Sequence, residues 1–203
     1  MNAPLPFGLP GPTAFYLALY LLTLVVHVVF MNYVLAGSGV LAWALLRGRA
    51  QDPIVRLLRD WMPFALGAAI TAGVAPLLFV QILYRQSFYT ANLLLFNRWM
   101  ALLPVLIVGF YLLYLQKAKA VGRWPAWSRT VVGVGAFLCF AFVAQAWTEN
   151  HLLSLAGQTT WSDFYAERRA LFLDPQLVPR LGVWFLGAFA TLAWMLGWQV
   201  RRE

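Results

Sequence analysis

Long runs of apolar residues dominate this chain, and their lengths predict an all-α integral membrane protein. The runs show neither the strict alternation of a half-buried strand nor the one-sided stripe of an amphipathic helix. Because a helix needs roughly 20 mostly apolar residues to cross a bilayer, we expect a bundle of about five transmembrane helices forming one domain over residues 1–203. The predicted spans are residues 14–46, 61–84, 99–115, 130–147 and 181–200.

The composition excludes an ordinary soluble domain. Only 11% of the residues are charged and 62% are hydrophobic, whereas about a quarter of the residues in a soluble domain are charged. The net charge of +8 does not indicate a nucleic-acid partner, because the basic residues lie in the loops between the apolar runs.

The basic residues alternate between the loops and so predict an orientation. The first loop, the third loop and the tail are basic, whereas the second loop has few charges and the fourth is mixed with acidic residues. Cytoplasmic loops are enriched in Lys and Arg, so we expect the N-terminus outside, the C-terminus inside, and a multi-pass protein of a bacterial inner membrane. The basic residues of the first and third loops are Arg47, Arg49, Arg56, Arg59, Lys117, Lys119, Arg123 and Arg129.

Proline and small residues predict how the helices pack. Pro76 interrupts the second span, and a membrane helix tolerates proline where neighbours satisfy the freed carbonyl, so we expect packing on several sides there. The aromatic segment 85–98 is expected to lie along the outer surface. Small residues let helices approach closely in lipid; the candidates are Gly37, Gly39, Gly67, Gly73, Gly133 and Gly135.

His27 is the main candidate for chemistry, because polar side chains inside a bilayer are costly and often functional. A neutral imidazole can ligate haem iron; the alternative is a hydrogen bond to a carbonyl of a neighbouring helix. Met31 shares a helix face with His27. Two axial ligands must approach iron from opposite sides, so Met31 is interpreted as part of the haem pocket or of the helix packing. Asn32 is expected to hydrogen-bond between helices.

A second polar group gathers at the predicted outer ends of the helices. Gln81 and Arg85 end the second span, and Gln145 and Glu149 end the fourth. One hypothesis is that they line a quinone head-group pocket or bond haem propionates, with Arg85 or Arg98 as the cationic partner. The alternative is a solvated rim with ion pairs.

Several segments resemble subunit I of the cytochrome bd quinol oxidases. The first is His27-Val-Val-Phe-Met-Asn-Tyr-Val-Leu-Ala-Gly37, which is similar to the opening helix of that family, where an early histidine ligates haem. The others are Gly73-Val-Ala-Pro-Leu-Leu-Phe-Val-Gln81, Ala146-Trp-Thr-Glu-Asn150 and Asp174-Pro-Gln-Leu-Val-Pro-Arg180. The resemblance covers most of this chain but only the first part of the family's subunit.

The chain also departs from that family. The third span has no acidic residue, and Leu181-Gly-Val-Trp-Phe185 has no histidine where the family has a haem ligand. The quinol-binding loop and the later helices have no counterpart before Glu203. The resemblance therefore implies a reduced subunit that does not reduce oxygen on its own.

Together these features predict a bd-like membrane subunit of a respiratory electron-transfer assembly, with one b-type haem ligated by His27. The second axial ligand would come from a partner, from a methionine such as Met195, or be absent. Other membrane subunits, and a cytochrome or iron-sulfur protein, are the expected partners. The alternative is a haem-free membrane anchor that docks a redox partner.

The predicted orientation can be tested by cysteine labelling in intact cells, in a chain whose native Cys139 is replaced by serine. With an impermeant thiol reagent, we expect Arg168→Cys and Arg169→Cys to react and Lys117→Cys and Lys119→Cys to react only after lysis. Labelling at position 117 in intact cells would reverse the orientation.

Overall fold

The structure, a computed structural model, describes residues 11–201, without the side chains of Lys119 and Ala120. Its regular elements are all helical over that range. In chain order they are α1 (Gly11–Leu46), α2 (Pro53–Leu83), α3 (Arg85–Leu94), α4 (Phe96–Lys117), the short 3₁₀ helix η1 (Lys119–Arg123), α5 (Ala126–Leu155), α6 (Gln158–Ala166) and α7 (Leu177–Val200).

Five of these helices are long and apolar enough to cross a membrane, which confirms the predicted multi-pass membrane fold. They are α1, α2, α4, α5 and α7. The helix that contains the second predicted span begins at Pro53, eight residues before that span, because Asp52 caps it and accepts a hydrogen bond from the Ile54 N–H at 3.0 Å. The segment predicted to lie along the surface forms α3 and the start of α4, whereas α6 was not predicted.

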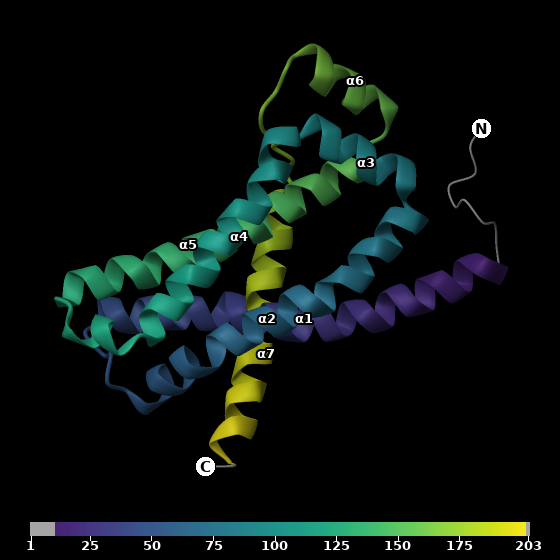
Figure 1. The fold of residues 1–203 in the computed structure, drawn as a ribbon. Coiled ribbons are helices and arrows are strands. Elements are labelled where there is room, and N and C mark those ends of the chain that lie inside the picture. The colour runs from purple at the N-terminus through teal and green to yellow at the C-terminus, as the bar shows by residue number, and fades with distance from the viewer. Residues whose placement is uncertain (1–10, 202–203) are drawn as a thin grey trace.

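The long helices form two antiparallel pairs and one crossing helix. Figure 1 shows α1 beside α2 and α4 beside α5, with α7 running across them. Two side-chain hydrogen bonds join α1 to α7, from Asn32 to Thr191 at 3.1 Å and from Tyr33 to Gln199 at 3.2 Å. The first confirms the predicted role of Asn32 between helices.

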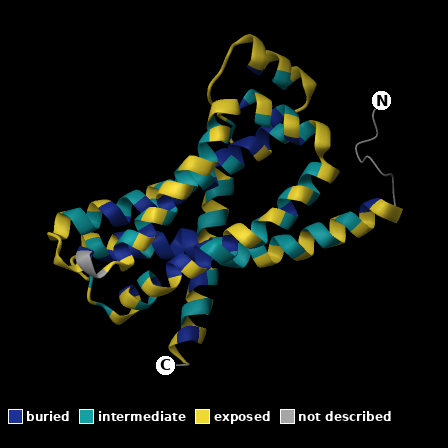
Figure 2. Cartoon of the chain, viewed as in Figure 1, coloured by how far each residue is buried: buried dark blue, intermediate teal, exposed yellow. Residues whose placement is uncertain are grey.

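The core lies where the helices cross, which is the dark blue centre of Figure 2. It is built from the middle of α1, the first half of α2, and shorter stretches of α4, α5 and α7. Its buried residues include Tyr33, Val34, Leu35, Ala36, Leu58, Met62, Leu113, Ala136, Phe140, Ala188 and Leu192.

Beyond this core, the first half of α1 and the second half of α2 pack mainly against each other. We call residues 11–31 and 67–83 the α1–α2 arm; Figure 2 shows it largely half-buried or exposed. Leu22 of α1 is 65% exposed, and Val74 and Leu78 of α2 are each more than half exposed. Pro76 itself is buried, whereas these two neighbours are not, and the expectation of packing on several sides around Pro76 stays a prediction.

The loops gather at two opposite ends. The loop after α1 and the segment with η1 share one end, where Ala50 and Gly122 line the same cavity. At the other end, α3, α6 and the start of α7 share a small apolar cluster that includes Ala91, Phe164 and Leu177 (Figure 1). The first and third loops thus lie together, as the charge pattern predicted.

Glycines mark most of the closest helix contacts. A Cβ at Gly37 would lie 3.1 Å from Met62 Sδ, and one at Gly39 would lie 3.2 Å from the Phe137 ring. At Gly109 of α4, a Cβ would lie 3.0 Å from the Phe140 ring of α5. Gly67 is an exception, because nothing lies within 4 Å of its Cβ position.

The α4–α5 contact provides a test of this packing. Gly109→Ala places a methyl group against a rigid ring, and we expect the free energy of unfolding to fall by about 1–3 kcal/mol, the usual cost of overpacking. The matched control is Gly187→Ala on α7, where nothing lies within 4 Å and alanine gains up to about 1 kcal/mol as a helix former. Thermal unfolding in detergent compares the two; equal midpoints would refute the tight contact.

Candidate functional site

His27 lies on the arm and faces α2. Its Nδ1 is 2.9 Å from the carbonyl oxygen of Ala69. A carbonyl oxygen only accepts hydrogen bonds, so Nδ1 carries the proton. In the neutral imidazole the lone pair is then on Nε2.

Gly73 allows this close approach of the histidine ring to α2. A Cβ at Gly73 would lie 2.8 Å from Cε1 and 2.9 Å from Nδ1 of His27, distances that side-chain carbons do not tolerate. A residue with a Cβ at this position would therefore push the imidazole away from Ala69. The ring is fixed by a hydrogen bond on one edge and by the helix backbone on one face.

The other ring nitrogen has no protein partner. Within residues 11–201 no hydrogen bond reaches Nε2 of His27, and the side chain is half-buried. Metal-binding histidines commonly donate the second ring N–H to a carbonyl, which fixes the tautomer and orients the ring. The Ala69 contact is of this kind, so the His27 geometry fits an axial ligand.

The described residues do not gather a set of further metal ligands around His27. No group of three or more His, Cys, Asp or Glu side chains that could hold a metal ion occurs among the described residues. Haem needs only one or two protein ligands because its ring supplies the others. Met31 is half-buried one turn further along α1, and His151 is exposed at the far end of α5.

A buried polar cluster lies at the α3–α6 end of the molecule. We call Arg98, Gln145, Glu149 and the Phe172 N–H the Arg98–Glu149 cluster. Arg98 Nε is 2.6 Å from Glu149 Oε2, and Gln145 donates to the same oxygen at 3.1 Å. Glu149 Oε1 accepts from the Phe172 N–H at 2.7 Å. Arg98 also donates to the Gln145 amide oxygen.

This cluster connects three parts of the chain. Arg98 begins α4, Glu149 belongs to the last turns of α5, and Phe172 lies in the segment before α7. Glu149 is 0% exposed, and both of its oxygens are occupied by protein donors. The cluster therefore holds these three parts of the chain together. Its carboxylate offers no free oxygen to a quinone or another ligand.

The structure brings some of the predicted site residues together and separates others. Gln145 and Glu149 meet Arg98, which was one of the two cationic partners considered. Gln81 instead accepts from the Tyr89 hydroxyl at 3.2 Å, and Arg85 is exposed. No hydrogen bond or ion pair among the described residues joins either of them to Glu149.

Other contacts here were not anticipated. Asn150 donates to Asn92 Oδ1 at 2.8 Å, which joins α5 to α3. The sequence carried a weak signal, because Asn92 stands between apolar residues in the aromatic segment and Asn150 follows Glu149 near the end of the fourth span. The partners of His27 and Glu149 on the backbone, Ala69 and Phe172, had no such signal, because any residue carries those groups.

Comparison with known proteins gives no relative. No protein-family model matches the chain, and neither does any curated protein or solved structure.

The Arg98–Glu149 cluster predicts a large loss of stability from a small change. Glu149→Gln leaves the partly buried Arg98 without a counter-charge, and breaking a buried ion pair in this way costs about 3–5 kcal/mol. We expect a clear fall in the thermal unfolding midpoint in detergent.

The control is Glu167→Gln, which breaks an ion pair with Arg169 whose two side chains are about half exposed. Such pairs are worth about 0–1 kcal/mol, so the midpoint should barely move. If Glu149→Gln lowers the unfolding midpoint no more than this control does, the cluster does not stabilise the fold.

Proposed function

We propose that this chain is a membrane subunit of a respiratory electron-transfer assembly and binds one b-type haem through Nε2 of His27. The observation that carries the proposal is the Ala69 contact at 2.9 Å. It fixes the protonated nitrogen and leaves the lone pair free on an apolar arm. The segment from His27 to Gly37, with its resemblance to the opening helix of cytochrome bd subunit I, supports the same assignment.

Gln81 and Arg85 are the better candidates for the polar edge of the haem. Gln81 follows Gly73 on α2 by 8 residues, which is roughly 12 Å along the helix axis, and Arg85 lies just beyond the end of α2, at the start of α3. Arg85 is exposed and has no ion-pair partner within the described residues. A guanidinium pairs well with a carboxylate such as a propionate. A quinone head group would use the same two side chains.

The bound haem would supply a one-electron redox centre. The chain's own residues hold and shield it: His27 ligates, Gly73 and Ala69 fix the ring, and Met31 packs beside it. Met195 is not assigned as the second ligand, because its side chain packs against the core cluster. We therefore assign the second ligand of a bound haem to a partner subunit that would cover the arm.

The second candidate is a haem-free membrane anchor that docks a redox partner. Two observations favour it. The Ala69 carbonyl already satisfies the one N–H of His27, and the arm exposes apolar side chains that a partner helix can cover. In both candidates the protein resides in a bacterial inner membrane.

Two substitutions of His27 separate these candidates. His27→Ala removes both ring nitrogens, whereas His27→Asn keeps an N–H donor near the Nδ1 position and removes Nε2. If haem is bound, we expect the wild type purified with its natural partners to show about one haem per chain and both variants to lose it. The measurement is a haem assay with a reduced-minus-oxidised spectrum.

The anchor predicts a different pattern. Haem would be absent from all three proteins, His27→Asn would assemble normally, and His27→Ala would lose only about 0.6 kcal/mol, the average for one hydrogen bond between membrane helices. Leu22→Val is the control, because Leu22 lies on the same arm, is 65% exposed, and its change leaves both ring nitrogens of His27 in place. Haem retained in both His27 variants would rule out His27 as the ligand.

A further inference from the structure

A small polar cavity lies at the basic end of the bundle, at the opposite ends of α4 and α5 from the Arg98–Glu149 cluster. It has a volume of about 50 Å³ and lies where the ends of α1, α2, α4 and α5 meet η1. Its lining residues with polar side chains are Gln51, Arg59, Gln116 and Arg129.

Three buried polar atoms of this cavity lack hydrogen-bond partners among the described residues. Gln116 of α4 is only 8% exposed, yet neither its amide nitrogen nor its amide oxygen has a hydrogen-bond partner. Nε of Arg129 is buried without a partner as well. Leaving such a group unsatisfied costs about 1–3 kcal/mol. We therefore expect the cavity to hold a ligand that forms hydrogen bonds with these atoms.

The positive charges that line the cavity favour an anionic ligand. Arg59 of α2 and Arg129 of α5 both line the cavity, and neither forms an ion pair with a carboxylate within residues 11–201. One water needs about 10–15 Å³ of such space, so roughly four water-sized groups fit. A phosphate group is of this size, and guanidinium groups pair with phosphate in a bidentate manner.

Gln116 restricts which kind of anion can bind in the cavity. Its amide N–H can donate to a phosphate oxygen, but its amide oxygen needs a donor. A phosphodiester has no donor of its own, whereas a glycerol head group carries hydroxyls that donate. The pair of arginines and the buried amide together fit an anionic head group with a hydroxyl.

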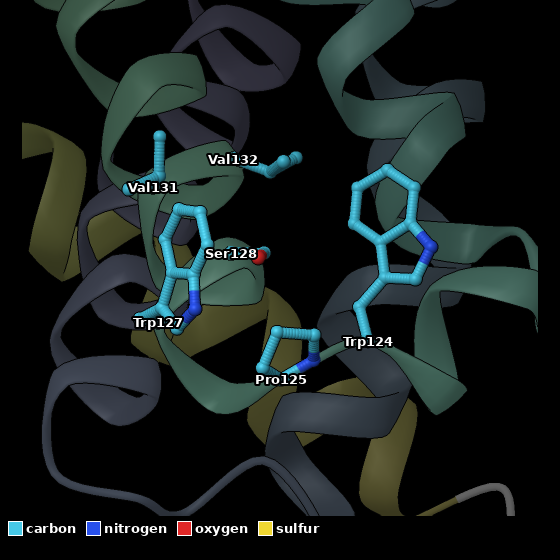
Figure 3. Close-up of a pocket in the computed structure, with 6 residues that line it drawn as sticks. All are labelled: Trp124, Pro125, Trp127, Ser128, Val131 and Val132. Atoms are coloured by element: carbon cyan, nitrogen blue, oxygen red, sulfur yellow. The ribbon is translucent and has the colours of Figure 1, made fainter.

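An apolar depression beside the cavity distinguishes a lipid from a free anion. It has a volume of about 480 Å³, and Figure 3 shows the Trp124 and Trp127 indoles on either side of Pro125 and Ser128. Arg129 follows Ser128 directly in the first turns of α5. Tryptophans at a helix end are typical of the membrane interface, and an acyl chain or glycerol backbone suits this surface.

We propose that this end of the protein binds an anionic phospholipid of the phosphatidylglycerol type. The phosphate lies between Arg59 and Arg129, a head-group hydroxyl donates to Gln116, and the apolar part lies against Trp124 and Trp127. Basic pockets between membrane helices bind anionic lipid head groups in the same way.

The test is lipid binding to the full chain in detergent, measured by native mass spectrometry with phosphatidylglycerol, phosphatidylcholine or inorganic phosphate. We expect the wild type to prefer phosphatidylglycerol, and the double variant Arg59→Gln/Arg129→Gln to bind it at least about tenfold more weakly, the equivalent of 1.4 kcal/mol. The matched control is Arg56→Gln/Arg123→Gln, which removes two exposed charges from the same end and should bind like the wild type.

Two further variants check the parts of the site. Gln116→Leu should weaken phosphatidylglycerol binding without changing the charge, and Trp127→Ala should weaken lipid binding but not phosphate binding. Equal loss in the control double variant would show a diffuse charge effect and overturn the site. Inorganic phosphate that displaces the lipid and binds as tightly would overturn the assignment to lipid.

Discussion

The lack of water in a bilayer is the constraint on which this structure depends. A backbone or side-chain polar group in the hydrocarbon must find its partner inside the protein. Asn32 donates a hydrogen bond to Thr191, Tyr33 donates to Gln199, and the Nδ1–H of His27 donates to the Ala69 carbonyl. Each of these bonds joins two different helices, so the polar groups that lipid makes expensive also fix which helices are neighbours.

Two kinds of contact hold the helices together, namely close contacts at glycines and the buried Arg98–Glu149 cluster. In lipid, helices gain little from hiding apolar surface and must associate by close contact. The glycines at positions 37, 39 and 109 provide that contact in the core, while the Arg98–Glu149 cluster ties the α3–α6 end. The arm has the close approach of His27 to Gly73 but no saturated polar cluster, and only α1 and α2 build it. Its two helices therefore keep apolar faces toward lipid or toward another subunit.

The sequence predicted the helices better than the sites. The five spans follow from the length of the apolar runs, and the shared end of the first and third loops follows from their charges. The ends of the helices were less predictable, because Asp52 extends α2 through a stretch that carries Arg56 and Asp60. α6 was not predicted, because nine residues with a mixed pattern give no clear period.

Side-chain partners were predictable only where both members are polar side chains. Gln145 and Glu149 stand one turn apart, so their meeting follows from helix geometry. Their bond to Arg98 depends on how α4 and α5 pair. The bonds from His27 to Ala69 and from Glu149 to Phe172 end on the backbone, where the residue type carries no information. The crossing of α7 over α1 likewise depends on packing among several helices and not on any local pattern.

The two ends of the molecule differ in whether their charged groups have partners within the protein. This difference distinguishes a cluster that stabilises the fold from a cavity that can bind a ligand. At the α3–α6 end, Glu149 is fully buried and every one of its oxygens has a protein donor, so the site is complete without a ligand. At the basic end, Arg59, Arg129 and the buried amide of Gln116 line one cavity, and no carboxylate pairs with them in the described part of the chain. His27 is intermediate, with one nitrogen satisfied and one free. A polar group without a partner is costly unless something outside the chain completes it, so the incomplete groups, and not the most deeply buried charge, are where ligands are to be sought.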